Sequence, residues 1–311
     1  MEKIATRISY GNALNELVKI RPDLFVLDAD VSHATMTLTF AKENPERFFN
    51  CGIQECNMLG VAAGIASTGR LVFASAFAMF AAGRAFEIVR NSIGYPKLNV
   101  KIGATHAGIS VGEDGASHQC CEDIALMRTI PGMTIINPAD DVEARAAVLA
   151  MADYEGPTYL RFGRLPVPVF NNPDTYKFEL GKGVTLRDGD DVTIIATGLL
   201  VYPAVEAAEE LAREGISARV INIHTIKPLD EELILKAARE TGKIVVAEEH
   251  SVIGGLGSAV ADVVSEKAPV PVVKLGVNDE FGHSGPAVQL LEEFGLTTAG
   301  IIEKVKKVIG K

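Results

Sequence analysis

The sequence predicts an α/β protein with two consecutive α/β domains, each a mostly parallel sheet flanked by helices. Short apolar runs alternate with longer amphipathic segments, which is the pattern of parallel strands joined by helical connections. The alternation stops in a stretch rich in Pro and Asn at 166–186 and then resumes. A chain of 311 residues is long enough for two domains. We therefore expect one domain at 1–165, a linker at 166–186 and a second domain at 187–311.

The first domain begins with a helix over 8–21, where apolar residues recur at helical spacing, and a strand over 23–28, where they are continuous. Further apolar runs predict strands at 47–50, 71–75, 100–104, 133–136 and 157–161. Between them, helices are predicted at 38–44, 55–67, 80–94 and 121–128. The segment Asn137-Pro-Ala-Asp140 is a strong helix start, so an alanine-rich helix follows it to Met151. Residues 105–119 are polar and rich in Gly, which predicts a loop.

The second domain repeats the alternation. Apolar runs predict strands at 192–197, 217–223, 243–247 and 270–275, and amphipathic segments predict helices at 203–214, 230–240, 257–267, 286–294 and 298–309. After the third of these strands come Glu248-Glu-His250 and then Gly254-Gly-Leu-Gly257, and the glycine segment is interpreted as a tight turn. The glycine spacing does not fit a dinucleotide-binding motif, and the two carboxylates would repel a pyrophosphate.

Composition and charge argue against several classes of function. The chain has 40 acidic and 30 basic side chains and a formal net charge of −10, which argues against nucleic acid as a partner. The uncharged runs 56–69 and 71–83 are shorter than the roughly 20 residues of a membrane-spanning helix, so no membrane partner is expected. None of the four cysteines forms a CxxC motif, and we expect reduced thiols and a cytoplasmic location.

The stretch 49–80 carries the first candidate binding site. Glu55 stands at the head of an almost uncharged segment, and Phe77 and Phe80 stand at its end. A poorly solvated carboxylate can share a proton with a ring nitrogen, and aromatic side chains can stack on a flat heterocycle. On spacing alone, a glutamate that caps a helix and two core phenylalanines are the commoner explanation.

The loop at 105–119 carries the second candidate site. His106, Glu113, Asp114 and His118 lie in it among glycines that permit tight turns and a close approach to a ligand. No HxH or HxxxH pair is present, so a metal site on this chain is the weaker interpretation. A polar substrate pocket is the stronger one.

Arg7 and Arg164 are candidates for binding a phosphate group. Arginine forms bidentate hydrogen bonds with phosphate, and Arg164 directly follows a glycine, although surface arginines are common. In parallel sheets, ligands bind at the carboxyl ends of the strands. Five candidate residues follow predicted strands and are expected to share one such edge: Glu55, His106, Asp114, His118 and Arg164.

Several segments together resemble the second half of the transketolase family. They are KIATR at 3–7, GIQE at 52–55, SAFAMF at 75–80, GEDGASHQ at 112–119, IKPLD at 226–230 and the Glu-Glu-His segment at 248–250 with the glycines after it. The loop motif at 112–119 is the most specific of these, because related thiamine enzymes differ there. The resemblance implies a pyrimidine-binding domain up to about 165 and a transketolase C-terminal domain from about 187.

The resemblance also implies roles for individual residues. Glu55 matches the catalytic glutamate that hydrogen-bonds the aminopyrimidine of thiamine diphosphate, and Phe77 and Phe80 match the aromatic residues that stack on that ring. His106, Asp114 and His118 match residues that bind sugar hydroxyls, with the two histidines counted as catalytic. Arg7 and Arg164 match a clamp for the substrate phosphate. Two positions depart from the family pattern: Gly83 stands where many members have a further aromatic residue, and Ala34 stands near the position of a phosphate-binding serine.

One absent motif predicts a partner. The family binds the diphosphate and its metal ion, Mg²⁺ or Ca²⁺, through a GDG motif and a downstream Asn segment on an N-terminal domain, and this sequence contains no GDG. The resemblance therefore implies half an enzyme, with an N-terminal, diphosphate-binding subunit as partner. A dimer of heterodimers, that is, a heterotetramer, is the expected assembly.

The leading hypothesis is thus the C-terminal subunit of a split, thiamine-diphosphate-dependent transketolase of the pentose phosphate pathway. It would transfer a two-carbon ketol unit from a ketose phosphate to an aldose phosphate. One alternative is a beta-type subunit of another thiamine enzyme, such as a 2-oxo acid dehydrogenase or a deoxyxylulose phosphate synthase. Another is a non-catalytic α/β module that binds a partner.

Overall fold

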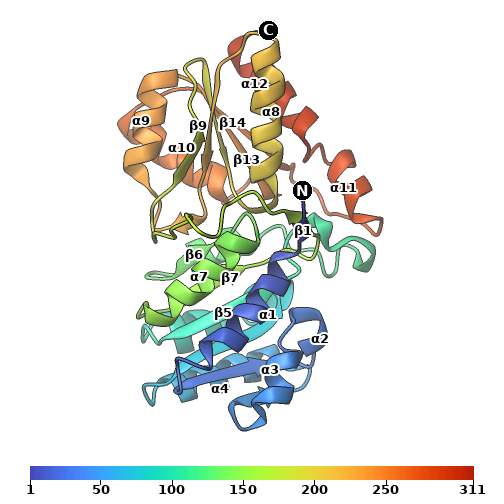
Figure 1. The fold of residues 1–311 in the computed structure, drawn as a ribbon, viewed down its shortest axis with the longest axis vertical. Coiled ribbons are helices and arrows are strands. Elements are labelled where there is room, and N and C mark those ends of the chain that lie inside the picture. Colours follow the sequence, from blue (N-terminus) through green and yellow to red (C-terminus); the bar gives the residue numbers. More distant parts are fainter.

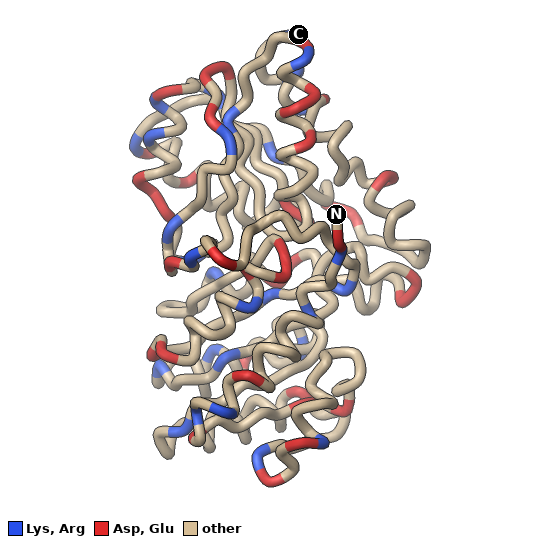
Figure 2. The backbone as a smooth tube through the Cα atoms, in the orientation of Figure 1, with Lys and Arg blue, Asp and Glu red and all other residues tan.

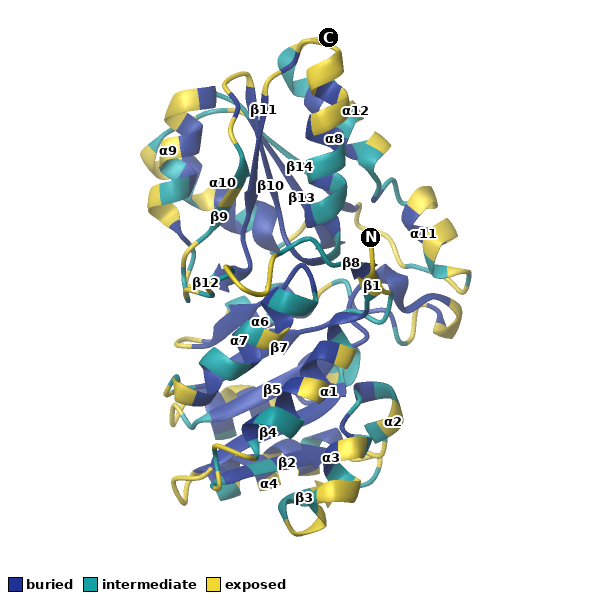
Figure 3. Cartoon of the chain, in the orientation of Figure 1, coloured by how far each residue is buried: buried dark blue, intermediate teal, exposed yellow.

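A computed structural model describes residues 1–311 and has the predicted class, two α/β domains whose sheets are mostly parallel and covered by helices (Figure 1). The first domain, blue to green in Figure 1, lies below the second, which is yellow to red. Both domains place their strands in the interior and expose the outer faces of their helices, as Figure 3 shows.

The first domain is built on a seven-stranded sheet in the order β12-β6-β7-β5-β4-β2-β3. All neighbouring strands in it are parallel except β12, which is antiparallel to β6. Parallel strands that are buried on both faces are continuous apolar runs, which is why the sequence identified them. The strands are β2 (Leu24–Asp28), β3 (Phe48–Asn50), β4 (Leu71–Phe77), β5 (Val100–Thr105), β6 (Thr134–Ile136), β7 (Thr158–Arg161) and β12 (Thr225–Lys227).

Helices cover both faces of this sheet. One face packs against α1, α3 and α7, and the other packs against α4, η2, η3 and α6. The helical segments of this domain are α1 (Thr6–Leu17), α2 (Ser32–Thr35), α3 (Leu38–Glu43), η1 (Pro45–Arg47), α4 (Glu55–Ala66), η2 (Met79–Arg84), α5 (Phe86–Ile88), η3 (Val89–Gly94), η4 (Ile109–Asp114), α6 (Asp123–Arg128) and α7 (Asp141–Asp153).

The second domain contains a five-stranded sheet in the order β14-β13-β10-β11-β9, of which only β9 is antiparallel to its neighbour. Helices α8, α11 and α12 pack on one side of its core, and α9 and α10 pack on the other. The strands are β9 (Val184–Arg187), β10 (Val192–Ala196), β11 (Ala218–Asn222), β13 (Ile244–Ser251) and β14 (Val272–Val277). The helical segments are η5 (Gly198–Leu200), α8 (Val201–Arg213), α9 (Glu231–Thr241), α10 (Leu256–Lys267), α11 (Ala287–Glu293) and α12 (Thr298–Ile309).

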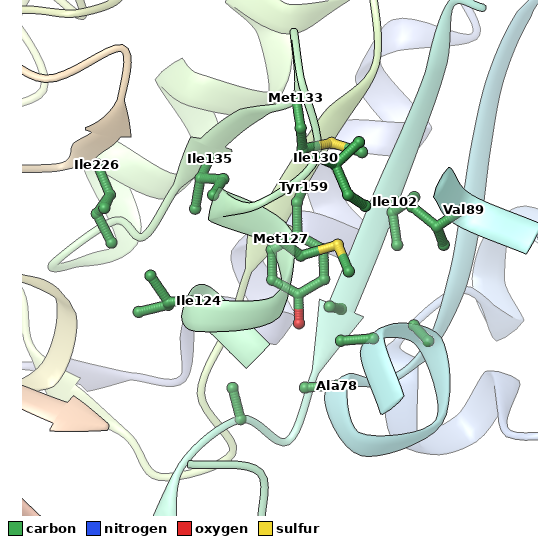
Figure 4. Close-up of a cluster of buried hydrophobic side chains, with 14 of the residues drawn as sticks. Ala78, Val89, Ile102, Ile124, Met127, Ile130, Met133, Ile135, Tyr159 and Ile226 are labelled. Carbon is green, nitrogen blue, oxygen red and sulfur yellow. The ribbon is translucent and has the colours of Figure 1, made fainter. Parts of the chain in front are cut away.

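The two domains share one sheet and one apolar core. Strand β12 leaves the second domain and pairs with β6, with Thr225 opposite Ile136. Ile226 of this strand lies beside Ile135 among the buried side chains of the first domain (Figure 4). The domains are therefore joined by backbone hydrogen bonds and by apolar packing, as well as by the connecting chain.

The segment 166–186, predicted as a linker, is partly ordered into strands. Strand β8 (Val167–Pro168) pairs with β1 (Lys3–Ile4), and β9 begins at Val184, inside the segment. The backbone N–H groups of Phe170 and Asn171 donate to the Asp140 carboxylate at the start of α7, at 3.0 and 2.8 Å. These hydrogen bonds hold the segment against the first domain.

Three segments differ from the prediction in their secondary structure. The single helix expected at 80–94 is two π-helical segments, η2 and η3, around the short α5, and the loop at 105–119 contains the 3-10 segment η4. The strand expected at 243–247 continues through 248–250 and ends at Ser251 as β13. Local spacing does not distinguish a π-helix from an α-helix, because the difference arises from tertiary packing.

Charged residues are distributed over both domains. Figure 2 shows basic and acidic residues interspersed along the whole backbone. Among the helices, none combines the length and the apolar character needed to cross a bilayer.

Candidate active site

The candidate site lies where β4, β5 and β7 end at one edge of the first sheet. These neighbouring parallel strands end at Phe77, Thr105 and Arg161. Their register places the segments that follow them, which carry Phe80, His106 and Arg164, at the same edge. The strand order thus brings together residues that are far apart in sequence.

Four rings form one aromatic group at this edge. The ring of Phe77 stacks on His106 with centroids 4.0 Å apart and on Phe80 with centroids 6.2 Å apart. His118 contacts Phe80 edge-on, with centroids 5.3 Å apart. Phe77, Phe80 and His118 are each half-buried, so this group presents ring surface to a ligand.

Glu55 begins α4 and has an exposed fraction of only 4%. Its Oε2 accepts a hydrogen bond from a guanidinium nitrogen of Arg84 at 2.8 Å. The same guanidinium lies 4.7 Å above the centre of the Phe80 ring. Arg84 therefore joins the carboxylate to the aromatic group.

Arg84 was missed as a site residue in the sequence analysis. The sequence places it on the charged face of a single helix, together with Glu87 and Arg90, and such a face is normally solvated. In the structure it ends the π-helical segment η2, whose wider turn changes which side chains share a face. No pattern in the sequence indicates that turn.

The pyrimidine end of thiamine diphosphate fits this group of side chains. Glu55 offers a buried carboxylate whose Oε1 makes no hydrogen bond within the chain, and Phe77 and Phe80 offer half-buried rings next to it. At Gly83, where many family members have a third aromatic residue, the side chain of Met79 occupies the space that a Cβ would need. A carboxylate acceptor beside an aromatic surface is the arrangement expected for binding a protonatable flat ring.

Arg7 and Arg164 lie next to the aromatic group and line an opening of about 270 Å³ together with Ser110, Glu113 and Ala287. A guanidinium nitrogen of Arg7 donates to the carbonyl oxygen of Ala34 at 2.7 Å. Arg164 donates to the carbonyl oxygen of Val111 and to the Glu113 carboxylate, the latter at 3.1 Å. Guanidinium groups are suited to bidentate binding of carboxylate or phosphate, so two arginines at one opening could bind an anionic group.

The pKa values of Arg7 and His106 are lowered by burial and by the positive charges near them. Burial lowers the pKa of Arg7, and the positive charge of Arg164 lowers it further. Burial lowers the pKa of His106 to about 3, with Arg7, Arg164 and His118 adding to the effect. His106 is therefore neutral at ordinary pH, and its Nδ1 lies 2.9 Å from the Thr105 hydroxyl. A neutral imidazole can both donate and accept a hydrogen bond.

The two acids of the loop have different surroundings. Glu113 pairs with Arg164, whereas Asp114, the residue chosen from the sequence, ends η4 with an exposed side chain that makes no ion pair or hydrogen bond within the chain. Of the predicted residues, the structure groups Glu55, Phe77, Phe80, His106 and His118, places Arg7 and Arg164 beside them, and leaves Asp114 at the rim.

Asp28, at the carboxyl end of β2, was also missed. It is fully buried and accepts hydrogen bonds from Val31 N–H at 2.6 Å and from the hydroxyls of Thr35 and Thr37 at 2.6 and 3.1 Å. These contacts fix the turn of α2 that carries Ala34, the residue bound by Arg7. The only feature of the sequence that could have indicated a role for Asp28 is its position at the end of an apolar strand.

Comparison with known proteins identifies the family of this chain. The family model described as transketolase, pyrimidine binding domain, matches residues 2–168, and the model described as transketolase, C-terminal domain, matches residues 181–301. Among relatives, a putative transketolase C-terminal section from Methanocaldococcus jannaschii is 51% identical over 307 residues, which cover 98% of this chain and 96% of the relative. A 6-deoxy-6-sulfo-D-fructose transketolase subunit from Clostridium sp. is 42% identical, with 99% and 95% covered. A subunit of an apulose-4-phosphate transketolase from Phocaeicola vulgatus is 41% identical, with 99% and 98% covered.

Solved structures show the same relationship. A split-gene transketolase described as an inactive beta4 tetramer superposes with a TM-score of 0.91 at 54% identity, and 99% of both chains is covered. The transketolase from Leishmania mexicana superposes with a TM-score of 0.82 at 25% identity, but this chain covers only 46% of it. The chain belongs to the transketolase family, as a C-terminal subunit with a pyrimidine-binding domain and a C-terminal domain.

Proposed function

We propose that this subunit forms one half of a thiamine-diphosphate-dependent transketolase that transfers a two-carbon ketol unit between sugars bearing an anionic group. The observation that carries the proposal is the sharing of one sheet edge by Glu55, the Phe77–Phe80 pair and the two arginines. Glu55 and the two phenylalanines suit a cofactor ring, and the two arginines suit the anionic end of a substrate.

Glu55, Phe77 and Phe80 would hold the pyrimidine ring. When bound, the cofactor supplies the nucleophilic carbon that cleaves and forms the carbon–carbon bond of the substrate. The Glu55 carboxylate holds a proton at a ring nitrogen, and its burial at the start of α4 keeps water from competing for that position. The two phenylalanines fix the plane of the ring by stacking.

His106, His118 and the arginines would bind the sugar. Neutral His106 hydrogen-bonds a hydroxyl or the carbonyl oxygen of the substrate. His118, whose ring centroid lies 5.3 Å from that of Phe80, makes a second contact with the sugar. Asp114 at the rim binds a further hydroxyl. Arg7 and Arg164 bind the anionic end. Two relatives are described as acting on a sulfo sugar and on a sugar phosphate, which supports an anionic substrate without naming it.

A separate N-terminal subunit would bind the diphosphate and its Mg²⁺ or Ca²⁺. The related split-gene subunit is described as inactive when it forms a beta4 tetramer, which supports a requirement for a partner. We propose a dimer of heterodimers, with the active site at the contact between unlike subunits.

Glu55→Gln tests this assignment. The amide cannot hold the proton at the ring nitrogen, so turnover by the complex with the N-terminal subunit should fall by roughly a hundredfold or more, which is the usual range for a catalytic acid or base. Glu87→Gln is the matched control, because Glu87 is exposed and its carboxylate hydrogen-bonds only the side chain of Asn91. Near-normal turnover of the Glu55→Gln complex would remove Glu55 from the mechanism.

The same assay tests the class of enzyme. The subunit alone should be inactive, and mixing with the partner should give activity on ketose phosphates or sulfo sugars. Activity confined to 2-oxo acids would favour the beta-type subunit of another thiamine enzyme. Failure to associate with any thiamine-binding subunit would favour a non-catalytic module.

A further inference from the structure

We propose that Glu249, in the C-terminal domain, is a positioning residue that sets the anion-binding end of the active site by holding the segment 108–115. The proposal rests on the proposed function, because it assigns that opening to the anionic group of the substrate. It gives a role to the Glu-Glu-His segment at 248–250, which lies in the domain that contains none of the predicted site residues.

The carboxylate of Glu249 crosses from β13 to the loop. Its Oε1 accepts a hydrogen bond from the backbone N–H of Ser110 at 2.7 Å, and both residues are buried. A Cβ at Gly108 would collide with this carboxylate, and the φ of Gly108 is +85°. The loop therefore requires glycine at 108 both for its backbone conformation and for the approach of Glu249.

The first domain holds Glu249 in place from the opposite side. The guanidinium of Arg161, at the end of β7, donates to the carbonyl oxygen of Glu249 at 2.9 Å and pairs with the buried Asp123 at 2.8 Å. Burial raises the pKa of the Glu249 carboxyl, and the charge of Arg161 partly offsets this effect. The backbone N–H of Ser110 thus donates to a carboxylate, that of Glu249, whose residue is held in place by both domains.

A second contact from the C-terminal domain supports the same loop. The amide Nε2 of Gln119 donates to the carbonyl oxygen of His283 at 3.0 Å and to those of Ile109 and Gly112 at 3.2 and 3.3 Å. A side chain at Gly282 would collide with Gln119. The segment 108–115 therefore contacts the second domain on two sides.

This segment in turn holds Arg164. The guanidinium of Arg164 donates to Val111 and to Glu113, both within the segment, and Ser110, Glu113 and Arg164 line the same opening. A shift of Ser110 would move both acceptors of Arg164. The hydrogen bond at Ser110 thus determines where the guanidinium stands when an anion enters.

The neighbours of Glu249 make different contacts and supply a matched control. Glu248 accepts hydrogen bonds from Leu256 N–H and Gly257 N–H, both at 2.7 Å, and so caps α10. It is buried like Glu249, lies on the same strand and accepts backbone N–H groups, but it does not contact the loop. Glu248→Ala should reduce stability without affecting substrate selection.

The kinetic test compares an anionic aldose phosphate with uncharged glycolaldehyde as acceptor, using the assembled complex. Glu249→Ala should raise the KM for the aldose phosphate by roughly tenfold, a change equivalent to about 1.4 kcal/mol, while the KM for glycolaldehyde stays within about twofold. Glu249→Gln retains a carbonyl oxygen for Ser110 and should restore the wild-type ratio of the two KM values. Equal changes in KM for the two acceptors would overturn the proposal. So would a Glu249→Gln variant in which the ratio of the two KM values is not restored.

A second test does not depend on activity. Hydrogen exchange of the isolated chain should be faster over 109–114 in Glu249→Ala and unchanged there in Glu248→Ala. If the alanine variant does not fold, Glu249→Met keeps the volume and removes the acceptor. Unchanged exchange over 109–114 in the folded variant would refute the positioning role. A wild-type complex without transketolase activity would refute the proposed function instead, and exchange would still decide the role of Glu249.

Discussion

At the scale of single residues, His106 is held neutral by its surroundings. Its pKa of about 3 results first from burial and then from the positive charges of Arg7, Arg164 and His118. In the unfolded chain the ring has a pKa near 6.5, so its burial as a neutral group costs stability as the pH falls from about 6.5 toward 3. The neutral ring is available for hydrogen bonding to a substrate throughout the neutral range.

Arg7→Met should raise the pKa of His106. The substitution removes a cation that disfavours the imidazolium form but leaves the larger burial effect, so the pKa should move part of the way toward 6.5. An NMR titration of the His106 ring measures this shift. Arg145→Met is the control, because Arg145 pairs with Glu16 on the surface. An unchanged His106 titration in Arg7→Met would mean that the two groups do not share a site in solution.

At the scale of elements, the start of α7 fastens the connecting segment. Asp140 caps the helix by accepting from Glu143 N–H at 2.9 Å, and its other oxygen accepts from Phe170 and Asn171. Glu143 in turn accepts from the hydroxyl of Tyr176 and from the side chain of Asn222 in β11. One helix end therefore joins the connecting segment and the second domain to the first domain.

Asp140→Ala should lower the free energy of unfolding by about 2 kcal/mol or more, because it removes an N-cap and leaves two further N–H groups without their acceptor. Thr297→Ala is the comparison. Thr297 caps α12 through a single hydrogen bond to Gly300 N–H at 3.2 Å, so its loss should cost about 1 kcal/mol. Chemical denaturation of both variants measures the difference, and equal losses would show that the contacts to 170 and 171 contribute nothing.

The elements also show what local sequence can predict. The start of α7 was predictable because its cap lies in the adjacent sequence, and the strands were predictable because they are buried on both faces. The sharing of a sheet edge by Glu55, His106 and Arg164 followed from the positions of strand ends. The π-helical turns that bring Arg84 to Glu55, and the crossing of β12 into the other sheet, depend on packing between distant segments. No local pattern contains that information.

At the scale of the whole molecule, the two domains should unfold together. Strand β12 completes the first sheet from the second domain, and one apolar cluster extends from Met58 in α4 to Val260 in α10. Calorimetry of the isolated chain should therefore give a single unfolding transition whose van't Hoff enthalpy equals its calorimetric enthalpy. Two resolved transitions would contradict this coupling, and a fragment of 187–311 that folds alone would do the same.

The position of the chain ends has a practical consequence for handling this protein. Met1 lines a second opening, between the domains, together with Leu165 and Leu199, and Leu165 also lines the opening at Arg7 and Arg164. Strand β1, which pairs with β8, ends three residues before Arg7. The C-terminus lies at the far end of the second domain (Figure 1). A purification tag, a fluorophore or a surface anchor attached ahead of Met1 would crowd the arginine pair, whereas the same group attached after Lys311 would leave it accessible. Assays of this subunit should therefore use C-terminal attachments.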